Sequence, residues 1–223
     1  MKPVFITSTG TEIGKTLITC SLGWQLRAKG EEVRILKPIV SGFDPDDPTS
    51  DTRQILDCLG EEPNDETVGA VSPLRFFAPI SPDMAARREG KAIDFDALVG
   101  FCREAAAGER RLLIEGVGGA FVPLTNRHLV ADWIAELDCR TIVVTGSYLG
   151  TLSHTIATVN ALRHRGVRVT SIIVSESAES PVPLEETVAA FQHWLGGSRT
   201  YAVPRLSGDA PLWKRTPDIT VAL

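Results

Sequence analysis

The sequence predicts an α/β protein, with a mostly parallel sheet covered by helices on both faces, as a single domain over residues 1–223. Two observations predict this class. Short apolar runs rich in valine, isoleucine and leucine alternate along the chain with longer segments of helical periodicity. The runs are also apolar at nearly every position, as is typical of parallel strands that are buried on both faces.

The individual elements follow from these patterns and from their end signals. Apolar runs predict strands at 4–6, 33–36, 112–114, 141–144, 167–174 and 199–203. Periodicity predicts helices at 15–29, 50–58, 94–107, 129–137, 151–165 and 184–195, and a short helix within 80–90. Gly30 ends the first of these helices, and Ser50 caps the second. Residues 39–50, rich in Gly, Pro and Asp, predict a surface loop, and residues 60–92 are the least regular segment.

Composition narrows the class of protein. The net charge of −5 argues against a nucleic-acid-binding surface, and no apolar run approaches the ~20 residues of a membrane span. The first residues enter a strand without the pattern of a signal peptide. The four cysteines lack the spacing of a zinc site or a disulfide framework, so we expect reduced and mostly buried thiols. We therefore expect a cytoplasmic protein that binds neither nucleic acid nor membranes.

The segment after the first strand, Thr9-Gly10-Thr11-Glu12-Ile13-Gly14-Lys15-Thr16, has the features of a phosphate-binding loop. Small residues let backbone N–H groups approach phosphate oxygens, the lysine reaches the β- and γ-phosphates, and the hydroxyl contacts Mg²⁺. The usual spacing, G-x-x-x-x-G-K-[ST], would place its first glycine at Thr9. The alternative is a capped strand–helix junction with a solvated lysine. The flanking strand and helix favour the phosphate loop, and with it a P-loop NTPase-like fold.

Two further strand ends point to the same edge of the sheet. Glu115 ends an apolar strand, in the place where nucleotide-hydrolysing folds keep a carboxylate associated with Mg²⁺, and Gly116-Val117-Gly118-Gly119 follows it. Lys37 ends the second strand. Each residue alone is more often structural or solvated, but the carboxyl ends of parallel strands share one crevice. The pattern therefore predicts a nucleotide site in which Lys15 and Lys37 offset the charge of a transferring phosphoryl group.

These motifs together resemble one family, dethiobiotin synthetase. The segments "TGTEIGKT", "LKPIVSG", "SD", "SP…AA…EG", "IEGVGG…PL", "ADW" and "YLGTLSHT" match it in order and spacing, from residue 4 to about residue 175. The resemblance implies closure of a ureido ring in biotin synthesis, from 7,8-diaminononanoate, CO₂ and ATP with Mg²⁺. The intermediate implied is a carbamate that ATP phosphorylates before the second amine displaces phosphate.

The resemblance also implies a role for each matching residue. The Mg²⁺ ligands would be Thr16, Asp51 and Glu115. Catalytic charge stabilisation would fall to Lys15 and Lys37. The nucleotide would contact Glu12, Ile13, Gly14, Lys15, Thr16, Glu115, Gly118, Ser175 and Pro204. The next residue after the loop, Leu17, is given no contact with the nucleotide. The diamine and its carbamate would lie near Thr11, Ser41 and Gly118, with the diamine's carboxylate bound across a homodimer interface by Gly150, Thr151, Leu152 and Ser153.

The chain departs from the family pattern at a few positions. The family loop usually has glycine in place of Ser8 and aspartate in place of Gly10. An asparagine that commonly contacts the nucleotide base is replaced by Ser175. Asp51 lies in an acidic loop, where a single carboxylate is more often simply solvated, and only the resemblance selects it as a metal ligand. Its place after Ser50, at the start of a helix, would also make its charge favourable to the helix dipole.

Other classes of P-loop protein share parts of the pattern. Amidoligases of the cobyrinate type usually carry a glutamine-hydrolysing domain, for which we expect no room in 223 residues. Partitioning and septum-site ATPases have a second lysine early in the loop, and none stands near Gly10. A non-catalytic nucleotide-binding module would not need Lys37, Asp51 and Glu115 together.

Overall fold

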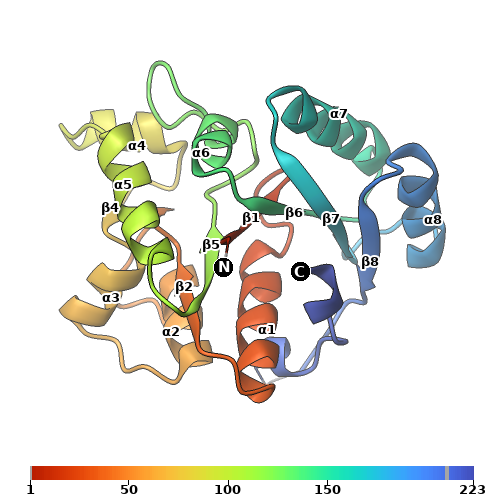
Figure 1. Cartoon of the computed structure of the whole chain (residues 1–223), viewed down its shortest axis with the longest axis horizontal. Coiled ribbons are helices and arrows are strands. Elements are labelled where there is room, and N and C mark those ends of the chain that lie inside the picture. The colour runs from red at the N-terminus through yellow and green to blue at the C-terminus, as the bar shows by residue number, and fades with distance from the viewer. Residues whose placement is uncertain (1, 209–210) are drawn as a thin grey trace.

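The structure is a computed structural model and describes residues 2–208 and 211–223. Its main sheet has six strands in the order β2-β5-β1-β6-β7-β8, and every neighbouring pair is parallel (Figure 1). The strands are β1 (Val4–Ser8), β2 (Val33–Leu36), β5 (Arg111–Glu115), β6 (Arg140–Thr145), β7 (Arg168–Ser175) and β8 (Arg199–Val203). The prediction of a parallel α/β sheet is confirmed.

The chain has eight helices among its described residues, and all but α4 contribute to covering the two faces of this sheet. The helices are α1 (Lys15–Ala28), α2 (Asp51–Leu59), α3 (Asp65–Val71), α4 (Pro82–Arg88), α5 (Phe95–Ala106), α6 (Val130–Leu137), α7 (Thr151–His164) and α8 (Leu184–Trp194). Two 3₁₀ turns follow, η1 (Leu212–Lys214) and η2 (Thr220–Ala222). Successive strand residues alternate between the faces: Val4 and Ile6 pack with α1, α2 and the C-terminal turns, whereas Phe5 packs with α5 to α8. The two cores hold the sheet rigidly beneath its loops.

One sequence-based prediction is wrong. Residues 39–50 do not form a loop throughout, because Ile39–Ser41 is a strand, β3, which pairs in parallel with β4 (Leu74–Phe76) in a second, two-stranded sheet. Ile39 and Val40 are buried there. A three-residue strand is too short to show periodicity, and its partner lies far along the chain. The segment 60–92 likewise contains α3 and β4 besides the expected short helix, which is α4.

Two other expectations, the cap of α2 and the burial of the cysteines, are met. Ser50 caps α2 by accepting a hydrogen bond from the backbone N–H of Arg53 at 3.4 Å. All four cysteines are free and buried. Within residues 2–208 and 211–223, no helix has the length and apolar character needed to cross a membrane.

Candidate nucleotide-binding site

The loop between β1 and α1 has the backbone conformation of an anion-binding turn. Glu12 and Gly14 both have left-handed φ angles, 58° and 93°, which curve the chain around the start of α1. Among the described residues, no side chain caps the N-terminus of this helix. Its first backbone N–H groups are therefore available to a ligand, and the helix dipole favours a negative one.

Strand β6 and the loop after β5 hold this loop in place. The backbone N–H of Thr9 donates to the carbonyl of Val144 at 3.2 Å. The hydroxyl of Ser8 donates to the carbonyl of Gly118 at 3.0 Å. At Gly119, an added Cβ would lie only 3.2 Å from the backbone nitrogen of Gly10, so the two loops can pack this closely because residue 119 has no side chain.

Lys15 folds back over the loop that precedes it. Its ammonium donates to the hydroxyl of Ser8 at 3.2 Å and to the carbonyl of Gly10 at 3.4 Å. Burial, and secondarily the charge of Lys37, lowers the pKa of Lys15 to about 8. A phosphate group placed here would stabilise the charged lysine and would itself be stabilised by it.

Thr16, Asp51, Glu115 and Lys37 meet at one point beneath the loop. The hydroxyl of Thr16 lies 2.7 Å from Oδ1 of Asp51 and 2.8 Å from Oε1 of Glu115. The ammonium of Lys37 donates to the same Oε1 at 2.6 Å and also pairs with Asp51. These four residues, which sequence analysis placed in one site, thus come together from separate parts of the chain.

In this cluster the attraction between opposite charges outweighs the effect of burial on the pKa values. Burial disfavours the charged form of Lys37, but the carboxylates of Glu115 and Asp51 outweigh that effect and raise its pKa to about 12. Burial of Asp51 likewise opposes its charge, yet Lys37 holds the pKa of Asp51 below its ordinary value. The lysine is therefore a fixed cation at neutral pH.

The oxygen atoms of this cluster fit a magnesium ion. Two carboxylates and a hydroxyl are the hard donors that Mg²⁺ prefers, and it commonly completes its shell with water and phosphate oxygens. The second carboxylate oxygen of Glu115, Oε2, is buried without a hydrogen-bond partner among the described residues. The described residues contain no cluster of three or more His, Cys, Asp or Glu side chains that could hold a metal alone.

A cavity of about 730 Å³ opens above the cluster. Most of the predicted site residues line it, namely Thr11, Glu12, Gly14, Lys15, Thr16, Lys37, Ser41, Asp51 and Gly118. Glu115 does not line the cavity: it is fully buried behind the lining residues Thr16 and Lys37, to which it is bonded. Ile13 belongs to the loop beside the cavity. The cavity is also lined by residues that sequence reasoning did not select, among them Pro79, Ser81, Pro82, Val117 and Val122.

Leu17 lines the same cavity, although sequence analysis gave it no contact with the nucleotide. Its side chain is half-buried and packs against the core beneath α1. An apolar side chain has no hydrogen-bonding group to offer a phosphate. What Leu17 adds to the site is therefore an apolar wall at the start of α1.

The remaining predicted residues lie outside that cavity. Ser175 is the last residue of β7, and its side chain lies against the phosphate loop. A Cβ added to Gly14 would be 2.9 Å from the hydroxyl oxygen of Ser175. Pro204 follows β8, the strand paired with β7. The segment Gly150–Ser153 forms the start of α7, where Gly150 has a φ of 97° and no side chain among the described residues caps the helix. A single chain therefore does not bring this turn into the cavity.

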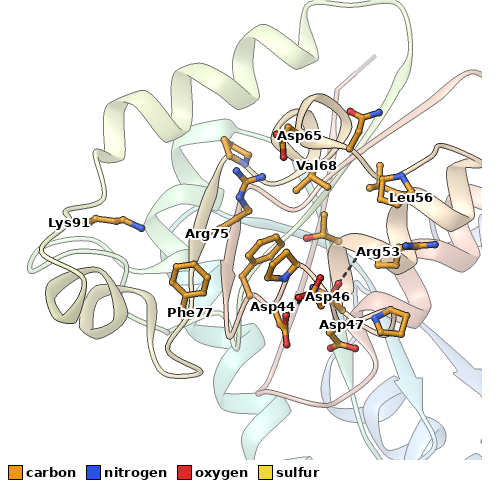
Figure 2. A pocket seen from close by; sticks show the side chains of 18 residues that line it. Asp44, Asp46, Asp47, Arg53, Leu56, Asp65, Val68, Arg75, Phe77 and Lys91 are labelled. Carbon is orange, nitrogen blue, oxygen red and sulfur yellow. Dashed lines mark hydrogen bonds between the residues drawn. The ribbon is translucent and has the colours of Figure 1, made fainter.

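Figure 2 shows a second cavity, of about 580 Å³. Asp44, Asp46 and Asp47 stand on one side of it, and Arg75 and Lys91 on the other. Asp47 lines both cavities, so the loop over residues 43–50 is a wall between them. Sequence analysis did not anticipate this second cavity, because its walls come from segments that were expected to be irregular.

The sheet, the loop and the cluster beneath it define a P-loop nucleotide-binding protein. A family model described as an AAA domain matches residues 2–208. The solved structure of a ParA family ATPase from Chlorobium tepidum TLS covers 96% of this chain, and 88% of its own, with a TM-score of 0.56. The MinD cell division protein of Aquifex aeolicus gives a TM-score of 0.54, over 92% of this chain and 83% of its own. At 13% and 14% identity, these structures show the fold alone.

Sequence relatives identify the family within this class. The ATP-dependent dethiobiotin synthetase BioD of Acidiphilium cryptum (strain JF-5) is 43% identical over 216 residues, which cover 96% of both chains. The enzyme of the same name from Methylobacterium nodulans is 40% identical, over 93% of this chain and 95% of its own. That from Caulobacter sp. (strain K31) is 39% identical, over 92% and 89%. The chain belongs to the dethiobiotin synthetase family.

Proposed function

We propose that this protein is an ATP-dependent dethiobiotin synthetase, a ligase of biotin biosynthesis. In this reaction CO₂ adds to one amine of 7,8-diaminononanoate, ATP phosphorylates the resulting carbamate, and the second amine closes the ring and releases phosphate. The observation that carries the proposal is the convergence of Lys15, Lys37, Thr16, Asp51 and Glu115 beside a cavity large enough for both substrates.

The loop would hold the triphosphate through backbone N–H groups of residues 12–16, with Lys15 bound to the phosphates. Thr16, Asp51 and Glu115 would hold Mg²⁺, which neutralises charge on the phosphate oxygens when it is bound. Phosphoryl transfer needs positioning and charge stabilisation rather than a covalent nucleophile.

Lys37 is suited to the transfer step itself. It is buried, permanently charged and at the edge of the cavity, so it can stabilise negative charge on the transferring phosphoryl group as that charge develops. Thr11, Ser41 and Gly118 line the same cavity and would position the diamine and its carbamate. The hydroxyl of Ser41 is buried without a partner among the described residues, which leaves it free for a substrate amine or carbamate oxygen.

The carboxylate of the diamine would bind at the start of α7, at Gly150–Ser153, across a homodimer interface. Two features support this assignment. The uncapped N-terminus of the helix favours an anion. Leu149 is 86% exposed and Leu152 is 38% exposed beside it, an apolar surface that a partner subunit would cover. We place the enzyme in the cytoplasm, where its four free cysteines would stay reduced.

The experiment that tests the proposal measures phosphate release from Mg-ATP and bicarbonate, with and without 7,8-diaminononanoate, together with dethiobiotin by mass spectrometry. We expect one phosphate for each dethiobiotin, and little release without the diamine. Phosphate release that is indifferent to the diamine, with no ring product, would overturn the synthetase assignment and favour a nucleotide-driven switch.

A further inference from the structure

A buried cluster of threonine hydroxyls joins the phosphate loop to the start of α7. The hydroxyl of Thr145, at the end of β6, lies 3.2 Å from that of Thr9 in the loop. It also lies 3.0 Å from the hydroxyl of Thr151 and 2.7 Å from that of Thr155. Thr145 and Thr155 are fully buried. The proposed chemistry uses none of Thr9, Thr145 and Thr155.

The hydrogen bonds of this cluster have one self-consistent direction. The hydroxyl of Thr151 donates to the carbonyl of Gly146 at 2.7 Å, so it must accept from Thr145. Thr145 has then used its single hydrogen, and it accepts from both Thr9 and Thr155. One donor and two acceptor sites are the whole capacity of a hydroxyl, so Thr145 is saturated. A directed chain thus runs from Thr9 through Thr145 and Thr151 to the backbone of the 146–150 turn.

This chain links two parts that ligands would occupy. On one side, Thr9 begins the phosphate loop, and its backbone N–H also bonds to β6 at Val144. On the other side, two hydrogen bonds from Thr151 close the turn at the start of α7. Its hydroxyl donates to the carbonyl of Gly146, and its backbone N–H donates to the carbonyl of Tyr148. A shift of the loop on nucleotide binding would therefore be transmitted to that turn through these hydrogen bonds.

We propose that Thr145 is a positioning residue that couples the phosphate loop to the turn over residues 148–153. The structural link stands on the hydroxyl geometry, whereas its consequence for catalysis rests on the proposed function, in which this turn receives the substrate carboxylate. Binding of nucleotide orders the turn, and by reciprocity a carboxylate bound at the turn favours nucleotide binding. In a homodimer whose turn faces the partner's cavity, the same link connects the two active sites.

Three variants separate this role from general stability, and a fourth guards against misfolding. Thr145→Val keeps the shape of the side chain but leaves Thr9 and Thr155 without an acceptor. Thr145→Ser restores the hydroxyl. Thr155→Val is the matched control, because it deletes a buried hydroxyl from the same cluster and leaves the chain from Thr9 to Thr151 complete. Thr9→Val cuts the link from the less buried end, in case Thr145→Val does not fold.

The test is amide hydrogen exchange of the peptide spanning residues 146–154, with and without a non-hydrolysable ATP analogue and Mg²⁺ at saturating concentration. We expect the analogue to slow exchange there about tenfold in the wild type, Thr145→Ser and Thr155→Val. Thr145→Val and Thr9→Val should show no slowing although the analogue is bound. Equal slowing in Thr145→Val and Thr155→Val, or none in the wild type, would overturn the proposal.

A second readout uses the reaction. Thr145→Val should raise the KM for 7,8-diaminononanoate about tenfold more than Thr155→Val does, with a smaller change in kcat. Equal KM values in these two variants would contradict the catalytic part of the inference. Failure of the proposed function would look different: no dethiobiotin would form with any variant, and the exchange pattern would remain interpretable by itself.

Discussion

The ammonium of Lys37 lies 2.6 Å from Oε1 of Glu115, and both side chains are buried at the ends of adjacent strands. Asp51 pairs with the same ammonium. One lysine is therefore bonded to both carboxylates that we propose as metal ligands. A divalent cation that approaches these oxygens has to compete with a lysine that is charged at every pH near neutrality.

This competition predicts that Lys37→Met binds divalent cations more tightly than the wild type does in the absence of nucleotide. Removing one positive charge at contact distance should lower the Kd for Mn²⁺ about tenfold. The loss of the free Mn²⁺ signal in electron paramagnetic resonance measures this. Lys15→Met is the control, because Lys15 donates to Ser8 and Gly10 rather than to the carboxylates, and should change the Kd less. Equal or weaker binding by Lys37→Met would contradict the competition.

The same substitution tests the catalytic role of Lys37. Lys37→Met keeps the apolar stem but removes the charge that would stabilise the transferring phosphoryl group, so kcat should fall about 100-fold or more. The Kd of an ATP analogue should stay within a few-fold of the wild type, because Lys15 and the loop remain. Steady-state kinetics and calorimetry check the two quantities, with Lys2→Ala at the surface as control. Weakened binding with unchanged chemistry in the bound state would refute a transition-state role.

The variant must be shown to fold, since removing Lys37 leaves Glu115 buried without its cation. Breaking a buried ion pair from one side costs about 3–5 kcal/mol, so we expect a lower Tm for the isolated protein. Mg²⁺ should restore part of that loss by taking the place of the lysine charge. A thermal melt with and without Mg²⁺ therefore belongs beside the kinetics.

Much of the site was predictable because it depends on local signals at strand ends. Glu115 ends a buried strand, Lys37 directly follows one, and Lys15 stands where the loop after β1 enters α1. The parallel sheet itself brings the ends of its strands to one edge. Asp51 is different. Its acidic surroundings carry no signal for a ligand, and only the family resemblance selected it, yet it lies 2.7 Å from the hydroxyl of Thr16.

What sequence reasoning missed depends on contacts between distant segments. The strand Ile39–Ser41 is defined by its pairing with Leu74–Phe76 rather than by its own periodicity. The hydroxyl of Ser8, which holds Lys15 and Gly118, lies in a position where the family usually has glycine. The hydroxyls of Thr9 and Thr145 are in contact although the two residues are 136 positions apart, and no sequence pattern predicts a hydrogen bond between two such threonines.

Close packing behind the phosphate loop predicts that Gly119→Ala weakens nucleotide binding. The new Cβ would lie 3.2 Å from the nitrogen and 3.3 Å from the Cα of Gly10, backbone atoms that cannot move without displacing the loop. We expect a loss of about 1–3 kcal/mol in stability and a weaker Kd for the ATP analogue. Thermal melts and calorimetry measure both.

Gly100→Ala is the matched control for this prediction. It lies inside α5, where an added Cβ meets no atom within 4 Å among the described residues. Alanine favours the helix over glycine by about 0.5–1 kcal/mol, so this variant should be as stable as the wild type or more so, with unchanged nucleotide binding. If Gly119→Ala were as stable as Gly100→Ala and bound the ATP analogue equally well, the prediction would be wrong, because the backbone at Gly10 would then move to accept the new Cβ.

The last prediction concerns the choice of nucleotide. Ser175 stands at the end of β7 against Gly14, where family members commonly place an asparagine beside the base. An amide offers a donor and an acceptor in fixed positions and so distinguishes the edges of different bases, whereas a rotating hydroxyl fits either kind of partner. We therefore expect kcat/KM values for GTP and CTP within about tenfold of the value for ATP in the wild type.

Ser175→Asn should raise the preference for ATP over both other nucleotides. Ser177→Ala is the control, because the side chain of Ser177 is already bonded to the backbone N–H of Ser147 at 3.0 Å and should not read the base. Competition assays with dethiobiotin as the measured product give the ratios directly. A wild-type enzyme that rejects GTP and CTP by about a thousandfold would show that another group reads the base. The next residues to mutate would then be those around Glu176. The carboxylate of Glu176 accepts from the backbone N–H of Arg205 at 2.8 Å and so joins the loop after β7 to the loop after β8.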